Sequence, residues 1–144
     1  MAGDMIDAFL NYLRCEKNRS EKTIDAYGRD LCEFEQYVRG LDGGLSLADA
    51  DTDVVRGWLG STMERGNTAS SVCRRLSALR TFYRFALGRG LVGHDPAHGV
   101  AGPKKAKPLP MYMRETDMDR LLDTVEWGDR YIDVRARTIL LTFY

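Results

Sequence analysis

Apolar side chains recur at intervals of three and four residues along the first part of this chain. Such spacing places one apolar stripe along a helix. The clearest stripe is Ile24, Tyr27, Leu31, Phe34 and Val38. Comparable patterns predict four helices over about residues 4–17, 20–39, 51–66 and 67–87. No segment alternates with the period of two that marks a half-buried strand, so the first domain is predicted to be all-α.

The residues at the ends of these segments support the same helices. Ser20 is a residue type that favours the N-cap of the second helix. Glycines follow the apolar patterns at Gly40, Gly66 and Gly88, where a helix commonly ends. All four prolines fall between His94 and Pro110, which predicts a stiff extended linker.

Two shorter helices are predicted beyond the prolines. One would be capped by Thr116, and the other would begin near Asp129. The apolar pattern of the second continues to Tyr144 without a stop signal, so we expect the sequence to continue in a longer protein. The expected organisation is a helical domain over 1–93, a linker over 94–110 and part of a second domain over 111–144.

Composition and charge narrow the class of protein. The 144 residues are 44% hydrophobic, with 21 basic and 21 acidic residues. The charges are unevenly distributed: residues 65–107 contain nine basic residues and one acidic residue. A block this basic suits a polyanion, although the alternative reading is a solvated helix face.

The fourth predicted helix carries a polar face without any acidic residue. Placed at 100° intervals, its outer face is Ser70, Arg74, Ser77, Thr81 and Arg84, with Arg75 and Arg80 at its flanks. Side chains of this kind donate hydrogen bonds to phosphate oxygens and guanine edges. A solvated face more often pairs Glu with Lys. The pattern therefore favours DNA binding.

Weaker candidates accompany this face. The second helix places Lys22, Thr23 and Arg29 on its polar side, where an ordinary amphipathic helix is an equally good interpretation. The linker contains a basic run that could follow a phosphate backbone or simply keep a connector in solvent. That run is Lys104, Lys105 and Lys107.

Other kinds of site find no support in the sequence. His94 and His98 flank a proline and have no third metal ligand nearby, and the three cysteines are widely spaced, so we expect no metal site and no cofactor. No run approaches the roughly 18 apolar residues of a membrane helix. A cytoplasmic protein that makes no membrane contact is expected.

Three motifs, in order, resemble the tyrosine recombinase (phage integrase) family, and the Xer-like recombinases in particular. The stretch from Ser20 to Leu31 is similar to the family's opening motif, and the stretch from Arg75 to Phe85 is similar to its fourth helix. The family's later signposts are matched by Asp95-Pro96, Pro103-Lys104 and Leu109-Pro110.

The resemblance implies a four-helix, SAM-like core-binding domain that forms half of a clamp around duplex DNA. By position, the resemblance assigns DNA contacts to Lys22, Thr23, Arg29, Ser70, Arg74, Ser77, Arg80 and Arg84. It also implies other recombinase protomers as partners, in a tetrameric synapse on DNA. The family's catalytic Arg, Lys, His and Tyr residues would all lie beyond Tyr144, so no catalytic residue is expected within this chain.

Two functions remain open at this point. The first is the DNA-binding half of a site-specific recombinase, whose parent would cleave and rejoin DNA with a tyrosine nucleophile. The alternative is a non-catalytic helical adaptor that binds DNA or another protein.

Overall fold

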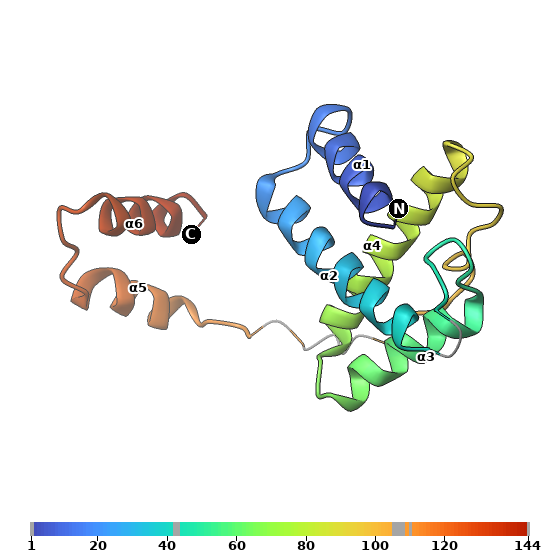
Figure 1. Cartoon of the computed structure of the whole chain (residues 1–144). Coiled ribbons are helices and arrows are strands. Elements are labelled where there is room, and N and C mark those ends of the chain that lie inside the picture. Colours follow the sequence, from blue (N-terminus) through green and yellow to red (C-terminus); the bar gives the residue numbers. More distant parts are fainter. Residues whose placement is uncertain (1, 42–43, 105–108, 110, 144) are drawn as a thin grey trace. The chain divides into compact units, whose positions relative to one another are not determined.

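The computed structural model describes residues 2–41, 44–104, 109 and 111–143, and the regular secondary structure of these residues is entirely α-helical (Figure 1). Its elements are α1 (Ala2–Cys15), α2 (Glu21–Gly40), α3 (Thr52–Glu64), α4 (Ala69–Gly88), α5 (Glu115–Thr124) and α6 (Tyr131–Phe143). They form two compact units, one over residues 1–106 and one over 107–144. The all-α prediction is confirmed.

Local capping explains where two of these helices begin. The Asp51 carboxylate accepts a hydrogen bond of 2.8 Å from the backbone N–H of Val54, which caps α3. The Thr68 hydroxyl likewise accepts from the N–H of Ser71 at 3.2 Å and caps α4. Ser20 occupies the N-cap position of α2 as predicted, but its hydroxyl bonds the Thr23 hydroxyl at 3.0 Å instead of the backbone.

The first unit is built around α4, which packs against α1, α2 and α3. The apolar stripe on its inner face is buried in full: Val72, Leu76, Leu79, Tyr83 and Ala86. It meets Phe9 of α1, Phe34 of α2 and Trp58 of α3 in one apolar core. Burial on this scale supplies the main favourable free energy of folding, and it leaves the opposite side of α4 facing outward.

The segment after α4 differs from the stiff linker predicted over 94–110. Pro96, Ala97 and Val100 are buried against the first unit. The Asp95 carboxylate accepts from the N–H of Ala97 at 2.9 Å and so fixes the turn. Prolines restrict the backbone but do not prevent small apolar side chains between them from packing, so residues 94–104 extend the first unit.

In its described residues, the second unit consists of the two helices α5 and α6 and their connections. Its first helix has Arg114 at the N-cap position, two residues before the predicted cap at Thr116. Its second helix begins at Tyr131, close to the predicted start near Asp129. None of the residues described in these two helices is buried. Across the described residues, no helix is long and apolar enough to cross a membrane.

Candidate nucleic-acid interface

The outer face of α4, which we define as Ser70, Arg74, Ser77, Thr81 and Arg84, lies opposite the buried stripe. Four of these side chains are exposed and Thr81 is half-buried. The Ser77 hydroxyl donates to the carbonyl of Cys73 at 2.9 Å, and the Thr81 hydroxyl donates to the carbonyl of Ser77 at 2.8 Å. These bonds to the preceding turn fix the hydroxyl oxygens and leave their lone pairs as acceptors.

At its N-terminal end, this face meets two carboxylates from α2. Arg74 donates a hydrogen bond to Asp30, and Arg75 forms an ion pair with Glu33 at 2.9 Å. Arg75 also lies 3.8 Å from the other Asp30 oxygen, and its guanidinium covers the Trp58 ring at 5.6 Å from the centroid. We call Asp30, Glu33, Arg74 and Arg75 the α2–α4 ion-pair cluster.

This cluster places Arg75 differently from the sequence prediction. Its side chain is only 12% exposed, whereas that of Arg74 is 44% exposed. Arg75 therefore stabilises the packing of α2, α3 and α4, whereas Arg74 is the more accessible of the two to a ligand. Two nitrogens of Arg75 are buried without a hydrogen-bond partner, so the carboxylates and the Trp58 ring supply most of its stabilisation.

Asp30 is the feature of this region that the sequence prediction missed. It is buried, and burial raises the pKa of its carboxyl group, against the opposing effect of Arg74 and Arg75. An acidic residue on the polar side of a helix ordinarily faces water. Only the approach of α4, whose Arg74 lies 44 residues away in sequence, turns it into a buried partner.

Arg80 also points into the protein rather than outward. Its guanidinium donates to the backbone carbonyls of Ala97 and Val100, which belong to the segment that follows α4. A charged donor satisfies carbonyl groups that would otherwise be buried without partners. The geometry thus makes Arg80 the anchor of residues 94–104, in contrast to the outward role predicted for it.

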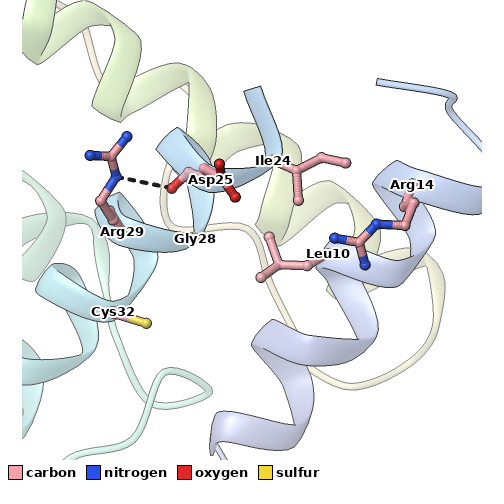
Figure 2. A pocket seen from close by; sticks show the side chains of 7 residues that line it. All are labelled: Leu10, Arg14, Ile24, Asp25, Gly28, Arg29 and Cys32. Atoms are coloured by element: carbon pink, nitrogen blue, oxygen red, sulfur yellow. Dashed lines mark hydrogen bonds between the residues drawn. The ribbon is translucent and has the colours of Figure 1, made fainter. Parts of the chain in front are cut away.

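The α2 candidates lie on an accessible surface. Lys22 and Arg29 are exposed and Thr23 is half-buried. Figure 2 shows the hollow between α1 and α2 near Arg29, whose guanidinium turns away from Leu10 and Arg14 of α1. Its Nε donates to the carbonyl of Asp25 at 3.3 Å.

Arg29 also borders a second hollow of about 410 Å³ that contains the ion-pair cluster. It therefore lies at the junction of α2 with the outer face of α4.

The remaining candidates belong to the basic run. Lys104 is exposed, at the point where the chain leaves the first unit. Lys105 and Lys107 lie outside the described residues. Arg84 lies at the C-terminal end of the α4 outer face. It is exposed and forms no ion pair with any described residue.

Among the described residues, no group of three His, Cys, Asp or Glu side chains could hold a metal ion. The outer face of α4 and the exposed part of α2 thus offer cations and hydroxyl groups. Such groups suit the recognition of a polyanion by hydrogen bonds and charge.

Comparison with known proteins agrees with this architecture. Residues 6–90 match the family model described as phage integrase, N-terminal SAM-like domain. The chain is 41% identical over 114 residues to tyrosine recombinase XerD of Bradyrhizobium diazoefficiens, an alignment that covers 79% of this chain and 35% of that protein. It is 38% identical over 140 residues to XerD of Pseudomonas aeruginosa, with coverage of 97% and 46%.

A third relative is a XerC rather than a XerD protein. Tyrosine recombinase XerC of Azotobacter vinelandii is 37% identical over 142 residues, covering 96% of this chain and 46% of that protein. The chain thus spans less than half the length of each of these relatives.

Proposed function

This chain belongs to the phage integrase family through its N-terminal SAM-like domain, and from that premise we propose that it is the DNA-binding part of a site-specific tyrosine recombinase. In this proposal the first unit holds duplex DNA while a catalytic part of the protein cleaves and rejoins the strands. The relatives named as tyrosine recombinases support the proposal by their similarity along most of the chain.

The observation that carries this proposal is the outer face of α4. No acidic residue occurs between Ala69 and Gly88, and the face exposes Ser70, Ser77 and Arg84 beside the basic side chains of α2. Cations and hydroxyl groups on one helix can contact phosphates and base edges together when the helix lies in the major groove.

The structure refines which residues we propose as DNA contacts. On α4 the contacts are the five residues of the outer face, and on α2 they are Lys22, Thr23 and Arg29. Lys104 would contact the backbone where the chain leaves the first unit, and Lys105 and Lys107 remain proposed from the sequence alone. Arg75 and Arg80 are assigned positioning roles, because their guanidinium groups are engaged inside the protein.

We further propose that residues 111–144 begin the catalytic domain and that the whole protein acts in a tetrameric assembly on DNA. The support is the greater length of the relatives, of which this chain covers 35–46% in the three alignments above. In this proposal the nucleophilic tyrosine and its cationic partners belong to the catalytic domain beyond residue 144. Strand cleavage requires such a nucleophile together with groups that stabilise charge on the phosphate.

A salt titration of DNA binding tests the proposed interface. We expect the 144-residue chain to bind a mixed-sequence duplex with an affinity that falls steeply as salt rises, because phosphate contacts release counterions. The variant Arg29→Ala/Arg84→Ala removes one cation from each helix. It should lower the affinity by at least tenfold near 0.1 M salt and reduce the slope of log K against log [salt] by roughly 1–2.

The matched control removes two cations elsewhere. Arg39 and Arg56 are exposed and pair with Glu35 at 2.6 Å and Asp53 at 3.1 Å. The variant Arg39→Ala/Arg56→Ala changes the net charge equally, so its slope should stay close to that of the parent chain. Equal loss in both variants would show a general charge effect, and absence of binding at low salt would remove the DNA-binding function itself.

A further inference from the structure

A second basic site lies at the C-terminal end of the α4 outer face. There Lys17, Arg19 and Arg84 surround a hollow of about 320 Å³, which we call the basic hollow. Its remaining lining residues are Tyr12, Leu13, Thr81 and Phe85. Lys17 and Arg19 come from the connection between α1 and α2, so three separate elements contribute to one concave surface.

The connection that carries Lys17 and Arg19 is held by the backbone. The N–H of Lys17 donates to the carbonyl of Tyr12 at 3.1 Å, and the N–H of Arg19 donates to the carbonyl of Leu13 at 3.0 Å. Asn18 between them has a φ of 46°, a left-handed conformation that asparagine tolerates better than most residues. This compact turn fixes both basic residues next to the end of α1.

The floor of the hollow is equally ordered. The Tyr12 and Phe85 rings pack at 4.8 Å between centroids, and the Lys17 ammonium lies 5.6 Å from the centre of the Tyr12 ring. A cation held over an aromatic face keeps its charge while its stem is restrained. The hollow is therefore a shaped surface with an aromatic base and a cationic rim.

No acidic side chain occurs among the described residues that line this hollow. The carboxylates on either side of the turn are used elsewhere: Glu16 pairs with Arg89 at 2.7 Å, and Glu21 pairs with Arg14 at 3.1 Å. Lys17, Arg19 and Arg84 form no ion pair with any described residue. Three uncompensated cations around one concavity favour the binding of an anion.

We propose that the basic hollow binds a backbone phosphate of duplex DNA, with Lys17 and Arg19 as contacts outside the polar faces of α2 and α4. The proposal rests on the DNA-binding function proposed above. Its geometric argument is continuity, because Thr81 and Arg84 belong both to the outer face of α4 and to the hollow. A duplex seated on that face would bring its phosphates toward the hollow, where a planar guanidinium and an ammonium can share the phosphate oxygens.

The test compares Lys17→Ala/Arg19→Ala with the control Arg39→Ala/Arg56→Ala in the same salt titration. Loss of one phosphate contact should reduce the slope by about 0.9 and lower the affinity roughly tenfold near 0.1 M salt. The variant Lys17→Arg/Arg19→Lys, which retains both charges, should restore most of the affinity. The helical circular dichroism of all variants should match the parent, because both side chains are exposed.

The outcomes separate this inference from the function on which it rests. If the parent chain binds duplex DNA and Lys17→Ala/Arg19→Ala keeps the parent's slope and affinity, the basic hollow is not a phosphate site and the α2–α4 interface stands. If the parent does not bind, both proposals fall. If the variant keeps DNA binding but loses self-association in sedimentation, the hollow binds an acidic surface of another protomer, and the phosphate assignment is wrong.

Discussion

The two ends of the α4 outer face carry similar cations in opposite electrostatic settings. At the N-terminal end, Arg74 and Arg75 meet Asp30 and Glu33 of α2. At the C-terminal end, Arg84 shares the basic hollow with Lys17 and Arg19, and none of the described lining residues is acidic. A count of basic residues along the sequence gives both ends the same weight.

This difference assigns the two ends different roles. Paired cations hold the helices together, and unpaired cations are available to a ligand. A cation that faces a buried carboxylate stabilises the fold but has much of its charge neutralised. A cation without a partner adds little to stability and remains available to an anion. The N-terminal end therefore positions α4 against α2, whereas in the proposed function the C-terminal end supplies the stronger electrostatic attraction for DNA.

The largest expected effect comes from removing the carboxylate at the N-terminal end. We expect Asp30→Ala to lower the free energy of unfolding by about 3 kcal/mol, because it removes the buried carboxylate that pairs with Arg74 and leaves Glu33 alone to compensate the nearly buried Arg75. Asp30→Asn keeps an acceptor for Arg74 and should cost about 1 kcal/mol. Urea denaturation followed by circular dichroism measures both.

Arg84→Ala at the opposite end is the matched comparison. Its side chain is exposed and has no ion-pair partner among the described residues, so the change in stability should stay within about 0.5 kcal/mol. Equal destabilisation by Asp30→Ala and Arg84→Ala would contradict the division of labour between the two ends.

A smaller loss of stability is expected midway along α4. Arg80→Met retains the apolar stem but removes the donors to the carbonyls of Ala97 and Val100. We expect a loss of about 2 kcal/mol, the typical cost of deleting a charged hydrogen-bond donor. The salt slope of DNA binding should remain that of the parent, because this guanidinium points inward.

Arg84→Met is the corresponding change one turn further along α4. It should lower DNA affinity with little effect on unfolding. A reduced salt slope in Arg80→Met, at unchanged stability, would return Arg80 to the DNA-contact set.

The elements of the fold were predictable because their signals are local. The apolar stripe of α4 and the starts of α3 and α4 near Asp51 and Thr68 each depend on residues within a few positions of one another. The same locality explains why the outer face of α4 could be outlined from the sequence. A helical period fixes which residues share a face, and the buried stripe fixes which face is turned outward.

The partners of the arginines could not be predicted in the same way. Arg74 lies 44 residues from Asp30, and Arg80 lies 20 residues from Val100. Whether such a side chain meets a carboxylate, a carbonyl group or solvent depends on how the helices pack. The long arginine stem also lets a residue at the flank of a polar face turn inward, as Arg75 does. The position of a residue around a helix predicts neither how the helices pack nor which way a long side chain turns.

The packing of residues 94–104 was missed for a related reason. Prolines and a basic run predicted a linker, but the small apolar side chains of Ala97 and Val100 are buried in the core of the first unit. Gly102 supports this close approach, since a Cβ there would lie 3.1 Å from the Cys73 sulfur. The complementary surface exists only after α4 has packed, and therefore cannot be read along the linker itself.

The smallest expected effect is a pH dependence whose sign distinguishes buried from exposed carboxylates. Burial raises the pKa of Asp30, so the folded state binds this proton more readily than the unfolded chain, whose value is near 3.8. The free energy of unfolding of the parent, relative to that of Asp30→Asn, should therefore increase as the pH falls through the raised pKa. The gain should be complete below the unfolded value and lost again as the pH rises.

Glu21 supplies the control of opposite sign. Its hydrogen bond and charge interaction with Arg14 lower its pKa from the usual 4.5. The stability that this pair contributes is present above pH 4.5 and is lost as the pH falls through the lowered pKa. The free energy of unfolding of the parent, relative to that of Glu21→Gln, should therefore decrease on acidification. All other titrating groups are common to each comparison and cancel. If acidification disfavoured the parent relative to Asp30→Asn as well, the ion pairs with Arg74 and Arg75 would outweigh the burial of Asp30. The N-terminal end would then be held mainly by charge attraction, and the contrast with the C-terminal end would lie only in whether its cations are paired.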